Sequence, residues 1–176
     1  MHGFNQGQTD VTELIERESP DIFMLQEHWL TPANLCKFDV FSDYFCFGCS
    51  AMAKQVESGL LVGRPFGGVL IMIKNDLRNF TKTVHCDERY AVIIVSNYVF
   101  INVYMPCSGT PDRRDLIENL LADISSWCDS FIDYNFVIAG DFNTNLFLGD
   151  DCAALFNSFI NDRDLVSCDK LFGMEN

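Results

Sequence analysis

Val137-Ile138-Ala139-Gly140-Asp141-Phe142-Asn143 is the stretch of sequence that decides the fold. Three apolar residues lead into a glycine, and an aspartate and an asparagine follow two positions apart. The apolar run is typical of a strand buried on both faces, and Gly140 allows backbone or a ligand to approach closely. The stretch predicts a strand whose carboxyl end carries Asp141 and Asn143, where open α/β sheets bind ligands. The alternative is an Asx turn that only caps the strand.

Two further apolar runs also end in polar side chains. Glu27 follows the run that starts at Ile22, and Tyr104 follows the run that starts at Ile101. A carboxylate such as Glu27 can hold a hard divalent cation such as Mg²⁺, which takes oxygen ligands and keeps several waters. Taken alone, Glu27 could equally be a solvated strand-end charge and Tyr104 an interface aromatic. Together, the three strand ends predict one shared site formed by Glu27, Tyr104, Asp141 and Asn143.

Four motifs, in this order, resemble the endonuclease/exonuclease/phosphatase superfamily, and most closely the apurinic-endonuclease-like domain of non-LTR retrotransposons. The motifs are Pro20-Asp21-Ile22 through Leu25-Gln26-Glu27-His28-Trp29-Leu30, Gly67-Gly68-Val69-Leu70-Ile71, Asn102-Val103-Tyr104-Met105-Pro106 and Ala139-Gly140-Asp141-Phe142-Asn143. The opening segment 2–7 fits the loop after the family's first strand. The resemblance implies an α/β fold, a four-layer sandwich of two facing mixed sheets flanked by helices.

The resemblance also implies a chemistry, the metal-dependent cleavage of phosphodiesters in DNA with Mg²⁺ or Mn²⁺. Glu27 matches the family's metal-binding glutamate. Asp141 matches the aspartate that orients or deprotonates the attacking water, and Asn143 and Tyr104 match groups that contact the phosphate. The likeness to retroelements further implies DNA as a partner, no membrane, and a reverse-transcriptase domain in the parent polyprotein.

Two motifs of the family have no counterpart in the sequence. The family's first-strand asparagine would precede His2, and its terminal Ser-Asp-His would follow Asp141, whereas His2, His28 and His85 all precede Asp141. We therefore expect a single domain over residues 1–176, truncated at both ends and weakly active or inactive. A catalytically dead remnant or interaction scaffold is one alternative. A phosphatase acting on inositol lipids or sphingomyelin-type substrates is another.

The composition limits these alternatives. A chain of 176 residues that is 48% hydrophobic can bury one sizeable core. No run approaches the ~20 apolar residues that span a bilayer, and the start lacks the pattern of a signal peptide. The eight cysteines lie mostly in apolar runs, which predicts reduced thiols in an intracellular protein, nuclear or cytoplasmic. The net charge of −13 argues against binding to a long stretch of duplex DNA by this chain alone, because such binding relies on Lys and Arg.

The remaining pattern alternates strands with helices, as layered α/β proteins do. We expect helices at 9–19, with a capping box at Asp10 and Glu13, and at 112–131 and 151–161. Residues 49–65 are predicted to form a long loop, and Asn97-Tyr98 a tight hairpin turn. Strands are predicted at 22–25, 44–47, 68–73, 81–85, 90–95, 99–105, 136–139 and 165–168.

Overall fold

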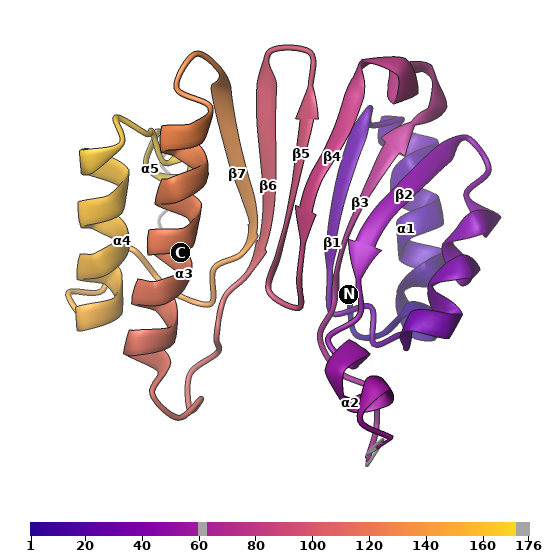
Figure 1. Cartoon of the computed structure of the whole chain (residues 1–176), viewed down its shortest axis with the longest axis horizontal. Coiled ribbons are helices and arrows are strands. Elements are labelled where there is room, and N and C mark those ends of the chain that lie inside the picture. Colours follow the sequence, from indigo (N-terminus) through magenta and orange to yellow (C-terminus); the bar gives the residue numbers. More distant parts are fainter. Residues whose placement is uncertain (60–62, 172–176) are drawn as a thin grey trace. The chain divides into compact units, whose positions relative to one another are not determined.

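The computed structural model describes residues 1–59 and 63–171, which divide into two compact units (Figure 1). Unit 1 comprises Met1–Tyr104 and Tyr134–Asp141, and it contains the sheets. Unit 2 comprises Met105–Asp133 and Phe142–Asn176, and it is built from helices. The chain thus leaves unit 1 after Tyr104, returns to it for a single strand, and leaves it again after Asp141.

The first sheet of unit 1 has the antiparallel order β1-β3-β2, with β1 at Ile22–Gln26, β2 at Tyr44–Cys49 and β3 at Val69–Lys74. The central strand β3 is buried from Val69 to Ile73. Successive side chains of a strand point to opposite faces, so a strand that is covered on both faces needs a continuous apolar run. The sequence Val-Leu-Ile-Met-Ile provides that run.

One face of this sheet is covered by helix α1 (Phe4–Glu18) and the 3₁₀ segment η1 (Pro32–Val40), as Figure 1 shows. Leu70 and Met72 of β3 point into this layer, where the ring centroids of Phe4 and Phe38 lie 4.8 Å apart, edge to face. The buried residues of this layer are Phe4, Val11, Leu25, Leu30, Phe38, Phe41, Tyr44, Leu70 and Met72.

The second sheet has the order β4-β5-β6-β7, with β4 at Thr81–Cys86, β5 at Tyr90–Val95, β6 at Tyr98–Tyr104 and β7 at Asn135–Asp141. Only the β6–β7 pair is parallel. The 3₁₀ segment η2 (Asn75–Phe80) connects β3 to β4. The two sheets pack face to face through alternate residues of their inner strands, which are Val69, Ile71, Ile73, Ala91, Ile93 and Val95.

Unit 2 is a pair of packed helices, α3 (Arg113–Ser130) and α4 (Asp151–Asp162), followed by the short helix α5 (Cys168–Leu171). The buried residues of α3 are Ile117, Leu121, Ile124 and Cys128, which lie three or four positions apart, and Leu116 is 40% exposed. The N-terminus of α4 is capped by Asp150, whose Oδ1 accepts a hydrogen bond of 2.7 Å from the amide of Ala153.

Helix α1 begins at Phe4, five residues before the predicted start at residue 9. Gly3 takes a positive φ of 81° ahead of the helix, and the amides of Gly3 and Phe4 donate to the carbonyls of Glu27 and His28. These tertiary bonds start the helix early. The predicted capping box at Asp10 and Glu13 was wrong, because both residues lie inside the helix.

Three other local predictions were wrong. The expected loop at 49–65 contains the short helix α2 (Ala53–Glu57), while residues 60–62 lie outside the described residues. The hairpin turn falls on Ser96-Asn97, one residue early, with Ser96 at a φ of 54°. The expected strand at 165–168 is absent, because the amide of Leu165 donates to the carbonyl of Ile160 and so ends α4 instead of pairing in a sheet.

The eight cysteines are free thiols, of which Cys128 and Cys152 are buried and Cys36, Cys107 and Cys168 are exposed. Over the residues that the structure describes, no helix combines the length and the apolar character that a membrane crossing requires.

Candidate functional site

Glu27 lies directly after β1 and is held by backbone on two sides. Its amide donates to the carbonyl of Gly68 at 2.9 Å, and its carbonyl accepts from the amide of Gly3 at 2.9 Å. Glu27 has a φ of 60°, in the left-handed region that side chains other than glycine rarely adopt. Surrounding bonds therefore fix an unfavourable backbone conformation, which is a common feature of functional sites.

Tyr104, the last residue of β6, touches the carboxylate of Glu27. The phenol hydroxyl donates to Glu27 Oε1 at 2.5 Å. Tyr104 is fixed from its other side by Arg89, whose carbonyl accepts the Tyr104 amide at 2.7 Å and whose guanidinium carbon lies 5.4 Å from the centre of the ring. Two of the predicted site residues are therefore in direct contact, although they are 77 positions apart in the chain.

Asp141, the last residue of β7, is the register partner of Tyr104 in the parallel β6–β7 pair. Register partners on adjacent strands point to the same face, and the strands are ~4.8 Å apart. At Gly140, with a φ of 142°, an added Cβ would lie less than 3.0 Å from the backbone of Val103. The glycine therefore permits the close backbone approach that the sequence predicted, and unit 1 brings together Glu27, Tyr104 and Asp141.

Asn143 belongs to unit 2, where several contacts fix its segment. Its side-chain Nδ2 donates to the carbonyl of Met105 at 3.0 Å, and its own carbonyl accepts from Arg113 at 2.6 Å. The preceding Phe142 packs edge to face on Phe156 of α4, with ring centroids 5.7 Å apart. Asn143 has a φ of 51°, which asparagine tolerates better than most residues.

The donor groups of the site fit a hard cation. The Glu27 side chain is 26% exposed, and its Oε2 lies 3.6 Å from Nδ1 of the exposed His2. Within residues 1–59 and 63–171, no three His, Cys, Asp or Glu side chains cluster in a way that could enclose a metal. Mg²⁺ is typically held by one or two carboxylates, waters and substrate phosphate, and the carboxylate oxygens of Glu27 are ligands of that kind.

Asn102 has a structural role at the site that the sequence motif did not reveal. It is fully buried, and its Nδ2 donates to the carbonyls of Leu25 and Leu70 at 3.0 Å each, while its Oδ1 accepts from Gln26 at 2.5 Å. One amide thus ties β6 to β1 and β3, and it places the end of β1 beside the end of β6. The available signal was an asparagine inside an otherwise apolar strand.

His28, next to Glu27, is a packing residue. It is fully buried, its Nδ1 accepts from the amide of Leu30 at 3.1 Å, and its Nε2 therefore donates to the carbonyl of Cys49 at 3.1 Å. Burial lowers the pKa of the ring below its ordinary value. Gly68, with a φ of 89°, leaves room for this ring, because an added Cβ would overlap the imidazole.

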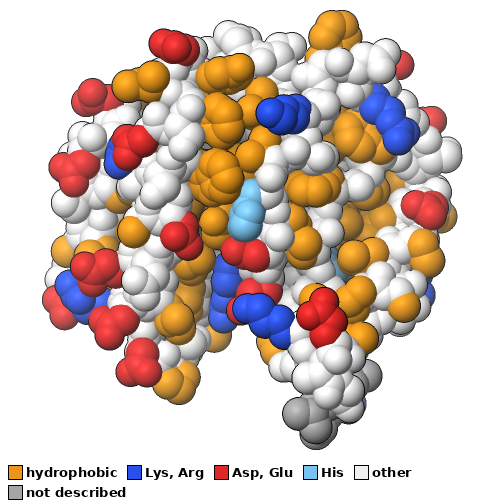
Figure 2. All heavy atoms as spheres, viewed as in Figure 1, with side chains coloured by type: hydrophobic (Ala, Val, Ile, Leu, Met, Phe, Trp, Pro, Cys, Tyr) orange, Lys and Arg blue, Asp and Glu red, His pale blue; other side chains and the backbone are white. Residues whose placement is uncertain are grey.

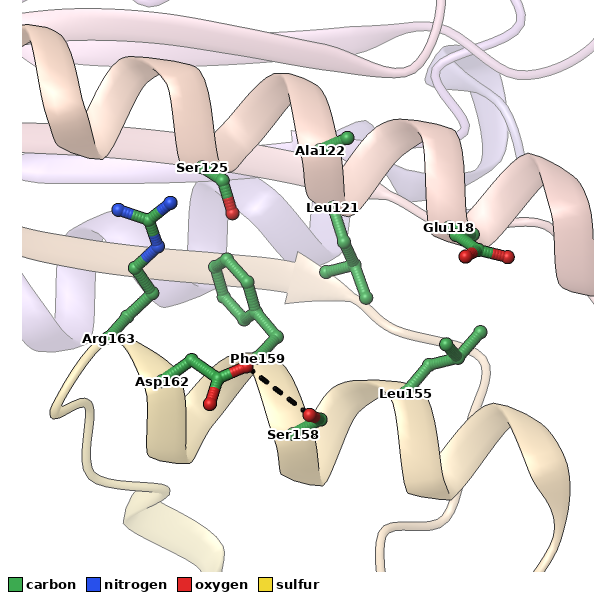
Figure 3. A pocket seen from close by; sticks show the side chains of 9 residues that line it. All are labelled: Glu118, Leu121, Ala122, Ser125, Leu155, Ser158, Phe159, Asp162 and Arg163. Atoms are coloured by element: carbon green, nitrogen blue, oxygen red, sulfur yellow. Dashed lines mark hydrogen bonds between the residues drawn. The ribbon is translucent and has the colours of Figure 1, made fainter.

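An open groove lies in unit 2, between α3 and α4, and contains none of the predicted site residues (Figure 3). Apolar side chains form its floor, and Glu118 and Arg163 lie toward its ends. Acidic side chains gather on the exposed face of these helices, as Figure 2 shows. Unit 2 has twelve Asp and Glu against four Lys and Arg, and unit 1 has thirteen against eight.

Solved structures share this fold. A 3′ phosphatase, NExo, from Neisseria, bound to a product DNA hairpin, is 17% identical with a TM-score of 0.63 over 91% of this chain and 67% of its own. An AP endonuclease from Archaeoglobus fulgidus is 13% identical with a TM-score of 0.64 over the same shares. The catalytic domain of human Nocturnin, with a bound sulfate anion, is 14% identical with a TM-score of 0.63 over 96% of this chain and 66% of its own. The predicted α/β sandwich fold is thereby confirmed.

A second NExo structure, a 3′-5′ exonuclease from Neisseria meningitidis, is matched over only 55% of its length. The chain thus spans between about half and two thirds of the structures it resembles. Among curated proteins, none matches significantly.

Two facing sheets with helices outside them define an α/β-sandwich fold, which this chain shares with a phosphatase and an endonuclease among the solved structures. The sequence profile of the Endonuclease/Exonuclease/phosphatase family matches residues 2–170. The chain belongs to this family, as the motifs predicted.

Proposed function

We propose that residues 1–176 form a single domain that cleaves phosphodiesters in DNA with Mg²⁺ or Mn²⁺. The observation that carries the proposal is the contact between Tyr104 and Glu27, with Asp141 beside Tyr104 in the sheet register. Three groups with different chemical roles thereby meet at neighbouring strand ends, which is where α/β sheets bind ligands.

Each side chain has a proposed role. Glu27 holds the divalent cation, which when bound polarises a phosphoryl oxygen and offsets charge on the leaving oxygen. Tyr104 orients the Glu27 carboxylate through its hydroxyl and contacts the substrate phosphate. Asp141 orients and deprotonates the attacking water, and Asn143 donates a hydrogen bond near the scissile phosphate.

We further propose that the chain comes from a non-LTR retroelement, acts inside the cell, and works beside a reverse-transcriptase domain. The support is the Gln26-Glu27-His28-Trp29-Leu30 context of the metal-binding glutamate. DNA as the substrate is supported by the nuclease relatives, one of which is bound to a product DNA hairpin. The net charge of −13 favours a short contact around the scissile phosphate over an extended interface with duplex DNA.

Nicking of supercoiled plasmid in MgCl₂ tests the proposal. The sequence contains no Ser-Asp-His motif, so we expect slow turnover, measured with the protein in excess over plasmid. Glu27→Gln and Asp141→Asn should each abolish nicking with unchanged circular dichroism. Asp21→Asn, at the opposite end of β1, is the matched control and should nick as the unmodified chain does.

The same preparation separates the alternatives. Phosphate release from an inositol lipid or from a sphingomyelin-type substrate, without nicking, would replace the nuclease by a phosphatase. Failure to act on any of these substrates, by a protein that unfolds cooperatively, would overturn the enzyme proposal in favour of a scaffold that retains only the fold.

A further inference from the structure

Arg113, the first residue of α3, has more hydrogen-bond partners than its place at a helix start requires. Its side chain is half-buried and uses all three of its nitrogens. Nε donates to the carbonyl of Pro106 at 3.0 Å, and Nη1 contacts Sγ of Cys152 at 3.2 Å. Nη2 donates to the carbonyl of Asn143 at 2.6 Å and to Oγ1 of Thr144 at 2.7 Å.

These partners come from three separate segments of unit 2. Pro106 lies in the segment that follows β6, Asn143 and Thr144 lie in the segment that follows β7, and Cys152 lies in the first turn of α4. Only the planar guanidinium presents donors in three fixed directions at once. Arg113 therefore holds both loops against the helix that bears it.

The guanidinium of Arg113 donates to neutral oxygen and sulfur atoms and not to a carboxylate. In the described part of the chain, no carboxylate lies within 4.0 Å of its guanidinium, whereas Arg114 pairs with Glu118 and Arg163 pairs with Asp129. Hydrogen bonds from a charged donor are roughly twice as strong as neutral ones. The bonds to the Asn143 carbonyl and the Thr144 hydroxyl are thus strong enough to fix the segment.

We propose that Arg113 is the positioning residue for Asn143. By holding the Asn143 carbonyl and the adjacent Thr144 hydroxyl, it sets the backbone at Asn143, and the bond from Asn143 Nδ2 to Met105 then orients the carboxamide. Arg113 acts on the reaction only through Asn143. This inference rests on the proposed phosphodiesterase function and adds the residue that organises one of its groups.

Single-turnover cleavage of a fluorescein-labelled DNA duplex in MgCl₂ tests the inference. Arg113→Gln should slow cleavage about 10–100-fold, the loss typical when the outer partner of a site group is removed. The duplex Kd, measured in CaCl₂, should change less than about twofold. In an Asn143→Ala background, Arg113→Gln should add less than about a twofold loss, because the group it positions is gone. The neighbouring Arg114→Gln is the matched control and should leave both quantities unchanged.

A second readout does not depend on activity. In ¹⁵N-labelled protein, Arg113→Gln should shift the Asn143 side-chain amide resonance and speed its hydrogen exchange, and Arg114→Gln should do neither. Arg113→Lys keeps the charge but loses the planar guanidinium with its several donors, so it should change the Asn143 resonance in the same way. It replaces Arg113→Gln in this experiment if Arg113→Gln does not fold. Equal rate losses with and without Asn143, or an unmoved Asn143 resonance, would overturn the inference. An inactive protein whose Asn143 resonance still responds would overturn the nuclease proposal alone.

Discussion

The two units each depend on one polar side chain that joins several segments, but the two side chains are of different kinds. In unit 1 the fully buried, neutral Asn102 bonds to Leu25, Gln26 and Leu70. In unit 2 the half-buried, charged Arg113 bonds to two loops and to the first turn of α4. Both organise residues of the predicted site.

The difference follows from the surroundings of each residue. Between two sheets a charge would lose its hydration, so a neutral amide with three satisfied bonds is the stable solution. At the start of α3 the guanidinium keeps some contact with water, and its reach allows it to gather loops. The cost of removing each residue should therefore differ, since unpaired groups between sheets have no access to water.

The largest effect is expected for Asn102→Leu, which keeps the shape but leaves the Gln26 amide without this partner and removes the hydrogen bond that Asn102 donates to each of the carbonyls of Leu25 and Leu70. We expect a loss of about 3–5 kcal/mol in the free energy of unfolding, because each buried unsatisfied group costs about 1–3 kcal/mol. Urea unfolding measures it. Asn119→Leu, at an exposed position of α3, is the control, and an equal loss in both variants would remove the special role of Asn102.

Gly140→Ala should have the next largest effect. The new Cβ would meet the backbone of Val103, which cannot rotate away, at a φ of 142°. We expect a loss of about 2–4 kcal/mol from strain and a displaced β6–β7 pair. Gly149→Ala, where nothing lies within 4 Å of the added Cβ, should change stability by less than about 0.5 kcal/mol. Thermal melts of the two variants would contradict this reading if they shifted Tm equally.

Arg113→Gln should cost less stability than either change in unit 1. Its partners at the helix start can bond to water once the guanidinium is removed, so we expect a loss of about 1–2 kcal/mol. Urea unfolding of Arg113→Gln and Asn102→Leu under the same conditions compares the two losses in the free energy of unfolding. A loss as large as that of Asn102→Leu would show that the segments around Arg113 are as closed to water as the space between the sheets.

The smallest effect concerns the exposed pair of Arg163 and Asp129, which links α4 to α3. The hydrogen bond from Arg163 holds the pKa of Asp129 below its ordinary value of 3.8. A lowered folded-state pKa contributes stability above about pH 4 that is lost as the pH falls through the folded value. Arg163→Gln should therefore lower Tm slightly at pH 7 and not at pH 2, and a difference that persists at pH 2 would refute the electrostatic origin.

The sequence by itself determined the strands and their polar ends. The continuous apolar run Val69–Ile73 forms a strand buried on both faces, as such runs predict. The prediction that the run before Gly140 is also buried on both faces was wrong, because β7 is an edge strand in which Val137 is 38% exposed. Because these patterns are local, they located Glu27, Tyr104 and Asp141 and fixed the family. The early start of α1 and the end of α4 at Leu165 were missed, since both depend on hydrogen bonds to residues that no local pattern identifies.

Only the tertiary structure decided which groups hold the site. Glu27 contacts Tyr104, which lies 77 positions later in the sequence, and Asn102 donates a hydrogen bond to Leu25, which lies 77 positions earlier. Arg113 stands in a run of charged residues, where nothing distinguishes it from Arg114 until the chain folds and brings Pro106, Asn143 and Cys152 within its reach. Hydrogen bonds act over about 3 Å, so a residue's partners are set by how the chain packs and not by its neighbours in sequence.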